Sequence, residues 1–231
     1  MGYVIFRGVS TQSLTGVYVS KMPSHKKAAM RNTEYYVKGR DGALHVDEGY
    51  ENFDVILSLV LINAPASTRQ VVNAWADGTG KLITSDDLTK AYKASVKDEV
   101  EWTRVQANDG FYDTATITFS CQPCMYEATD SVIEMTTSQA IINPGSADAY
   151  PLIKVEGSGD VTFSVAGDEI SIDDMVSGTP VFIDCENGYV YTPEGATTMT
   201  GEIPVLPMGS SNIVIGNNIT KLTITPHWRW V

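Results

Sequence analysis

Apolar and polar residues alternate along most of this 231-residue chain. In ATITFSC every second residue from Ala115 to Cys121 is apolar and the residues between carry hydroxyls, and DVTFSVAG at 160–167 repeats the pattern. A period of two residues is what a half-buried antiparallel strand requires. Asn187-Gly188, between VFIDC and YVYT, predicts a tight β-hairpin because both residues tolerate positive φ. The pattern predicts a mainly β protein.

Helical periodicity is confined to the first half of the chain. The best candidate helix is Thr68–Ala76, in which Val71, Val72 and Trp75 would share a face and Ser67 could cap the N-terminus. We expect one or two short helices in this half.

The second, weaker helix is expected over Thr89–Ser95, with Asp86 or Asp87 as its cap. Strands with short helices, followed by strands alone, suggest two domains. We place them at 1–126 and 127–231, because the sequence between Pro123 and Pro151 is loop-like.

The stretch FDVILSLVLI is apolar on both faces. Phe53, Val55 and the leucines form one side, and Ile56 and Val60 lie on the other. A strand of this kind lies either at the centre of a layer covered on both sides or against another subunit.

Charge is distributed unevenly within the overall net charge of −12. Residues 1–40 hold seven Lys or Arg against one acid, and residues 127–231 hold three against fourteen. Such asymmetry favours contact with an anionic molecule or between copies of the chain. No aromatic-rich RNA motif accompanies the basic segment, so a solvated or subunit-facing segment is favoured over nucleic-acid binding.

The motifs that could carry chemistry have structural explanations. CQPC at 121–124 lacks a second ligand pair for zinc and lies in the buried phase of a strand, so Cys121 and Cys185 are interpreted as small core residues. DGTGKL at 77–82 lacks the spacing of a phosphate loop and is interpreted as a turn. We therefore expect neither an enzyme nor a cofactor or metal site. No run approaches the roughly 20 apolar residues of a membrane helix, and we expect no membrane contact.

The order of the motifs resembles the distal tail proteins of siphophages. The segments that carry the N-terminal resemblance are FRGVSTQSLTGVYV, HKKAAMRNTEYYVKGRDGALHVDEGYENFDVILSLVL, NAWADGTGKLITSDDLTKAYKASV and ATITFSCQPCMYE. Those that carry the C-terminal resemblance are NPGSADAYPLIKVEGSGDVTFSV, VFIDCENGYVYT and IPVLPMGSSNIVIGNNITKLTITPHWRW. The resemblance implies a ring-forming N-terminal β domain followed by a galectin-like antiparallel β-sandwich.

The same resemblance implies a structural hub in the virion, at the tip of a phage tail, made in the host cytoplasm. Its expected partners are further copies of itself in a hexamer, the tail tube protein, the tail-associated protein and receptor-binding or baseplate proteins. DNA would pass through the ring without specific binding. We expect the basic segment to pack on the acidic surface of a neighbouring subunit. The expected interface residues are Lys26, Lys27, Arg31, Lys38, Arg40, Ile56 and Val60.

The C-terminal stretch is expected to work in two parts. Residues 219–225 would form the second strand of a hairpin closed by GNN at 216–218, and the chain would turn away after Pro226. Residues 227–231 would then pack Trp228 and Trp230 across the junction with the first domain as a clasp.

Two other functions remain open. A lectin-like protein could use Tyr189, Tyr191 or Trp228 as stacking platforms for sugars. A tail-tube subunit would share the ring but would not need the second domain.

Overall fold

The computed structural model describes residues 2–62, 64–107 and 110–231, which form two compact units. The first unit runs to Ala128 and includes Val231, and the second is Thr129–Trp230. Strands dominate both units, so the expected mainly β fold class is confirmed. Among the described residues, no helix is both long and apolar enough to cross a membrane.

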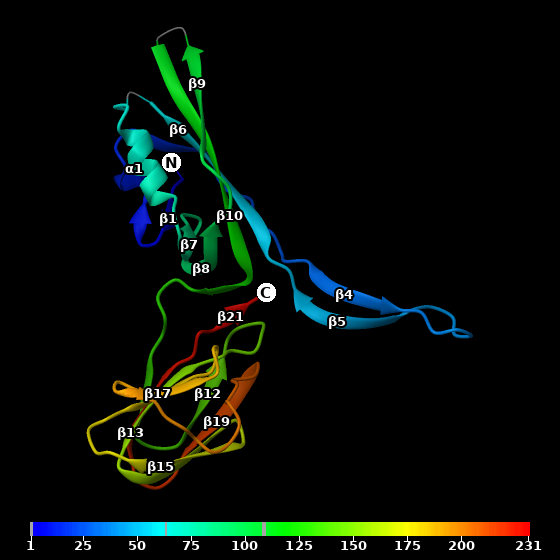
Figure 1. Cartoon of the computed structure of the whole chain (residues 1–231), viewed down its shortest axis with the longest axis vertical. Coiled ribbons are helices and arrows are strands. Elements are labelled where there is room, and N and C mark those ends of the chain that lie inside the picture. Colours follow the sequence, from blue (N-terminus) through cyan, green and yellow to red (C-terminus); the bar gives the residue numbers. More distant parts are fainter. Residues whose placement is uncertain (1, 63, 108–109) are drawn as a thin grey trace. The chain divides into compact units, whose positions relative to one another are not determined.

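The first unit contains one large antiparallel sheet, whose strands differ in length, and a separate two-stranded ribbon (Figure 1). Its strands are β1 (Val4–Phe6), β2 (Val9–Ser10), β3 (Val17–Lys21), β4 (Met30–Tyr35), β5 (Leu44–Tyr50), β6 (Phe53–Leu61), β7 (Thr79–Thr84), β8 (Asp87–Val96), β9 (Glu101–Ala107) and β10 (Gly110–Glu127). The main sheet runs β2-β1-β7-β8-β10-β6-β3, and β9 pairs with the first part of β10. Strands β4 and β5 pair with each other as a separate ribbon.

The core of the first unit lies on one face of this sheet. Strand β6 contributes Val55, Leu57, Leu59 and Leu61, all almost fully buried. Against them pack the aromatic rings of Phe6, Trp75 and Phe119, which meet edge to face with centroids 5.0–6.2 Å apart. Strand β6 pairs with β10 on one side and with β3, at the edge of the sheet, on the other. Its second apolar face is not covered within the chain, because Ile56 is 51% exposed, so contact of this face with another subunit stays a prediction.

The helix α1 (Thr68–Trp75) covers this core, and a short 3-10 helix precedes it at Thr11–Ser13. The helix is confirmed, but two details differ: Ser67 makes no side-chain capping bond, and Val71 is exposed while Val72 and Trp75 are buried. The indole of Trp75 donates to the carbonyl oxygen of Val9 at 2.9 Å. The apolar side chain of Val71 therefore faces solvent, although it was expected on the buried face with Val72 and Trp75.

The second expected helix, Thr89–Ser95, is wrong, because these residues lie inside strand β8. Strand β8 pairs with both β7 and β10, and this long-range pairing outweighs a weak local helix preference. Asp87 accepts hydrogen bonds from the backbone and hydroxyl of Thr89, which forms a side-chain turn at the start of a strand.

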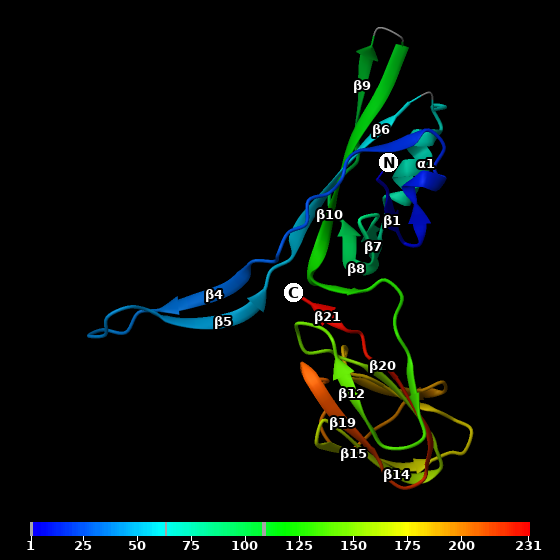
Figure 2. The same ribbon diagram turned by 180° about the vertical axis from the view of Figure 1, so that it is seen from behind.

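The second unit is a sandwich of two antiparallel sheets (Figure 2). Its strands are β11 (Ile133–Met135), β12 (Gln139–Asn143), β13 (Leu152–Gly157), β14 (Gly159–Val165), β15 (Asp168–Met175), β16 (Val181–Asp184), β17 (Tyr189–Thr192), β18 (Gly195–Ala196), β19 (Gly209–Ile215), β20 (Ile219–Thr225) and β21 (Arg229–Trp230). One sheet runs β11-β20-β13-β16-β17-β18 and the other β12-β19-β14-β15. The inner faces of the two sheets enclose one apolar core.

The hairpin at Asn187-Gly188 is confirmed: it joins β16 to β17, with Gly188 at φ 72°. The expected hairpin at 216–218 is wrong, because β19 and β20 belong to different sheets. Strand 219–225 itself is present, and its alternate residues Leu222 and Ile224 enter the core as expected. The turn at 216–218 thus carries the chain from one layer of the sandwich to the other.

Candidate interaction surfaces

The ribbon of β4 and β5 (Figure 1), which we call the arm, has an apolar face. Residues directly opposite each other in an antiparallel pair share a face, and Tyr35 pairs with Leu44 while Thr33 pairs with Val46. Tyr35, Leu44 and Val46 are 55%, 39% and 48% exposed. The other face carries the cross-strand pair Glu34 and His45. The arm is an amphipathic ribbon whose apolar side is uncovered in the single chain.

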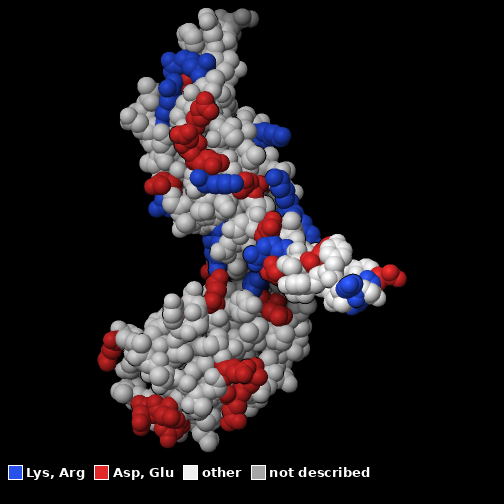
Figure 3. Space-filling view, turned by 45° about the vertical axis from the view of Figure 1, so that its right-hand side comes forward, with Lys and Arg blue, Asp and Glu red and all other residues white. Residues whose placement is uncertain are grey.

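The charge of the arm differs from what the sequence suggested. Residues 26–51 contain five Lys or Arg and five Asp or Glu, because the returning strand β5 brings acids against the basic segment. Arg31 donates to the carbonyl oxygen of Glu48 at 2.8 Å, and His45 lies 3.5 Å from the carboxylate of Glu34. Both signs of charge appear along the arm in Figure 3. The arm together with the segments at its base, residues 26–51, is therefore neutral, and the excess of base counted up to residue 40 arose because that boundary cuts the β4–β5 hairpin in half.

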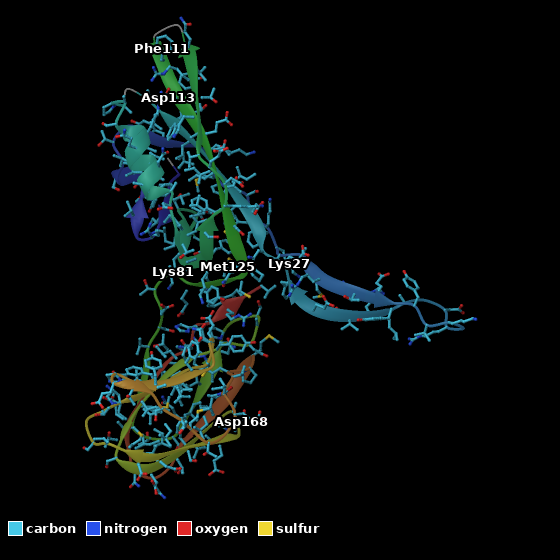
Figure 4. The ribbon with its side chains drawn as sticks, in the orientation of Figure 1. Lys27, Lys81, Phe111, Asp113, Met125 and Asp168 are labelled. Atoms are coloured by element: carbon cyan, nitrogen blue, oxygen red, sulfur yellow. The ribbon has the colours of Figure 1, made fainter. Side chains whose placement is uncertain are left out.

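The base of the arm is attached to the rest of the first unit by polar contacts. The ammonium of Lys26 donates to the carbonyl oxygen of Asp54 at 3.1 Å, and Asp54 also pairs with Lys97 at 2.7 Å. His25 contacts the carboxylate of Asp86. Hydrogen bonding from Thr84, and then from His25, lowers the pKa of Asp86. Figure 4 labels Lys27 at this base.

The expected basic interface residues are therefore not one cluster. Lys26 and Lys27 precede β4, whereas Lys38 and Arg40 follow it in the exposed loop between β4 and β5. The six residues of β4 separate the two groups by about 20 Å.

A second apolar surface lies on the face of the main sheet away from the core. Ile56 is half exposed there, Val60 is half buried, and Tyr18 of β3 is the direct partner of Val60. We call Tyr18, Ile56 and Val60 the β3–β6 strip. On the same face the neighbouring strand β10 carries hydroxyl groups, at Thr114, Thr116, Thr118 and Ser120. The apolar strip is therefore limited to strands β3 and β6. Tyr18 was not among the residues expected from the sequence, although its place between Val17 and Val19, which face the core, indicates that its side chain points outward.

The hairpin of β9 and β10 is held to helix α1 by an ion-pair network that the sequence did not indicate. The carboxylate of Asp113 receives Arg69 of the helix at 2.7 Å and Arg104 of β9 at 2.9 Å. Hydrogen bonds from Arg104 and Arg69 lower the pKa of Asp113. Beyond this root, Phe111 is exposed, with the guanidinium of Arg104 6.0 Å from its ring centroid (Figure 4). The root of the hairpin is thus fixed, while its outer part is exposed.

Trp228 lies in the core of the second unit and is only 4% exposed. Trp230 packs against the same core, and the carbonyl oxygen of Arg229 accepts from Ser146 at 3.0 Å. The strand is interrupted around Pro226 as expected, because β20 ends at Thr225 and His227 has a φ of 53°, but the alternation of buried residues continues to Trp228. Trp228 is therefore not an exposed platform for a sugar, and its role in a clasp stays untested. A clasp role for Trp230 stays a prediction.

The cysteines behave as core residues. Cys121 and Cys185 are buried in strand β10 and directly after β16, and burial raises the pKa of each thiol to about 12. The interpretation of Cys121 and Cys185 as small apolar residues is confirmed. Of DGTGKL at 77–82, only Asp77 and Gly78 lie outside a strand, and Thr79–Leu82 belong to β7, so the interpretation of the whole stretch as a turn is wrong.

Comparison with known proteins gives matches in structure alone. No family model and no curated protein matches the sequence. The Dit protein of phage SPP1, described as a paradigm of the hub adsorption apparatus in phages that infect Gram-positive bacteria, matches with a TM-score of 0.76 at 12% identity over 100% of both chains. A chain of the activated baseplate of phage P2 matches with a TM-score of 0.52 at 9% identity, covering 96% of this chain and 97% of that one. The chain therefore has the fold of phage distal tail proteins over its whole length.

Proposed function

We propose that this chain, which has the fold of a phage distal tail protein, is a structural hub of a phage tail tip. The observation that carries the proposal is the likeness to the SPP1 hub protein, which spans both units. The hub would join the tail tube to a tail-associated protein and to receptor-binding or baseplate proteins. It would act in the virion as a hexameric ring through which DNA passes.

Two different apolar surfaces on one chain support ring formation. The arm offers Tyr35, Leu44 and Val46, and the β3–β6 strip offers a second apolar surface. Contact between two unlike surfaces is heterologous, and repeated by rotation it closes a ring. We propose that the arm of each copy packs on the β3–β6 strip of the next. A two-stranded ribbon is marginally stable alone, so a partner surface also explains why the arm is retained.

The neutrality of the arm changes the expected chemistry of the interface. Charge attraction between a basic segment and an acidic neighbour would be screened by salt. Burial of the apolar face would not be weakened in this way. We propose that apolar contact dominates and that Lys26, Lys27, Arg31, Lys38 and Arg40 contribute at the rim. The acidic remainder of the chain would keep DNA from adhering to the ring.

The free energy gained by burying the apolar face of the arm can be calculated roughly from the exposed fractions of its three apolar side chains. Full burial of an exposed large apolar side chain is worth about 1.5–3 kcal/mol, and the three arm residues are each about half exposed. Covering them gives roughly 2–4 kcal/mol per contact, which corresponds to a factor of about 30 to 1,000 in association. Loss of this burial free energy at each contact should open a ring that is held together mainly by the arm.

The experiment compares the double variant Leu44→Ser and Val46→Ser with the control Val71→Ser, which changes an equally exposed valine on helix α1. Mass measurement by light scattering and negative-stain images should show closed rings for the wild type and the control, and smaller species for the double variant. Raising the salt concentration from 0.1 to 1 M should leave wild-type rings intact. Wild-type monomers at high concentration would refute the ring, and intact rings in the double variant would refute the arm contact.

A further inference from the structure

The outer face of the six-stranded sheet in the second unit carries a straight row of side chains across all its strands. Cross-strand register aligns the following residues in order: Glu134, Thr223, Lys154, Phe182, Tyr191 and Ala196. Five strand spacings make this row about 24 Å long. We call it the cross-strand row.

Aromatic rings occupy one end of the row. Phe182 and Tyr191 are direct partners, with ring centroids 5.2 Å apart and planes only 14° from parallel. Tyr189, two residues away on β17, is largely exposed on the same face. Each ring supports its neighbour, so the face presents a fixed apolar platform.

Paired charges occupy the other end. Lys154 is 2.9 Å from Glu156, and Lys221 is 2.6 Å from Glu134. Asp184 on the same face has its carboxylate engaged by the backbone of Asn187 and Glu186 in the adjoining turn. The face is therefore nearly neutral, although the second unit as a whole holds thirteen acids and three bases.

We propose that the cross-strand row is a binding site for a neutral oligosaccharide. A sugar ring has an apolar C–H face that stacks on an aromatic ring, and hydroxyls that both donate and accept hydrogen bonds. Such hydroxyls can bond to Lys154 and Glu156 together without changing the charge of the pair. Anionic polymers would be repelled by the acidic unit around the face.

A protein strand fits this face less well. Peptides that add to sheets bind along an exposed strand edge, where backbone groups are unpaired. The cross-strand row runs perpendicular to the strands, and its four central residues lie on strands that pair on both sides. Recognition there must come from side chains, and the platform beside hydrogen-bonding groups matches a glycan.

The test is affinity electrophoresis of the full chain in native gels containing mannan, glucan or dextran, with alginate as an anionic comparator. At least one neutral polysaccharide should slow the wild type, and alginate should not. Tyr191→Ala and Lys154→Met should each weaken binding at least tenfold, whereas Ile142→Ala, an exposed residue on the other sheet, should have no effect. Circular dichroism checks that each variant is folded.

Free migration of the wild type in all three neutral gels would overturn the proposal, as would stronger retardation by alginate. Retardation that survives Tyr191→Ala, or that is lost in Ile142→Ala, would also overturn it. The proposal goes beyond the hub function and does not depend on it. Ring mass measured on Tyr191→Ala should equal that of the wild type, so the two proposals fail separately.

Discussion

Replacement of Asp113 by Ala tests how the β9–β10 hairpin is held to helix α1. The change removes the acceptor of Arg69 and Arg104 at once. The side chain of Asp113 is largely buried, and Arg69 would be left partly buried without this partner, whereas Arg104 is free to turn to water. Loss of charged hydrogen bonds in such a setting costs about 1–3 kcal/mol.

The two arginines should contribute unequally. The side chain of Arg69 is 33% exposed and that of Arg104 is 56% exposed, so solvent screens the second pair more. In double-mutant cycles with Asp113→Ala, the coupling to Arg69→Ala should exceed the coupling to Arg104→Ala. Lys97→Ala, which breaks the exposed pair with Asp54, is the matched control and should change stability little.

The assay is hydrogen exchange followed by mass spectrometry. Amides of β9 and the first part of β10 should exchange faster in Asp113→Ala, while amides of β13 and β14 should be unchanged, because the two units have separate cores. Equal couplings for the two arginines, or unchanged protection of the hairpin, would show that strand pairing alone holds the hairpin.

The contribution of Asp113 should depend on pH in a defined direction. Its pKa in the folded chain is lowered by Arg104 and Arg69. A lowered folded pKa gives stability that is present above the unfolded value of about 3.9 and is lost as the pH falls through the folded value. The difference in hairpin protection between wild type and Asp113→Ala should therefore be full at pH 6 and should shrink below pH 4.

Two further predictions follow from burial. Trp228→Ala should destabilise the second unit by about 3–5 kcal/mol in denaturant unfolding, because the indole lies in its core; a loss confined to the first unit would contradict this placement. Cys121 and Cys185 should not react with Ellman's reagent at pH 8 until the chain is unfolded, because both thiols are buried with a pKa of about 12. Rapid labelling of the native protein would show that either strand opens readily.

Several features of the fold could be read from the sequence because they depend on neighbours along the chain. Alternation in β10 and β14 identified strands and their buried sides, and the helix α1 was found from a local period. The turn at Gly188 needed only a residue that accepts positive φ. The two-sided apolar pattern of β6 located a second apolar face, and it left open whether that face is covered within the sheet layer or by another subunit.

The features decided by tertiary structure depend on which strands meet. Period two shows which residues share a face, but it does not say which sheet a strand joins, so β19 and β20 were wrongly joined as a hairpin. Residues of β8 with weak helix preference became a strand because β7 and β10 pair with them from both sides.

The candidate surfaces show the same division. The sequence by itself determined the second apolar face at Ile56 and Val60, because both alternate with buried residues of β6. It left Tyr189 and Tyr191 open between a core or interface position and a stacking platform, and the structure shows that both are exposed. The pairing of separate strands decided two other features. The acids of β5 neutralise the basic segment beside β4, and Phe182 stacks on Tyr191 beside Lys154. Side-chain direction is a local property of a strand, whereas charge balance and stacking arise only when separate strands are brought side by side.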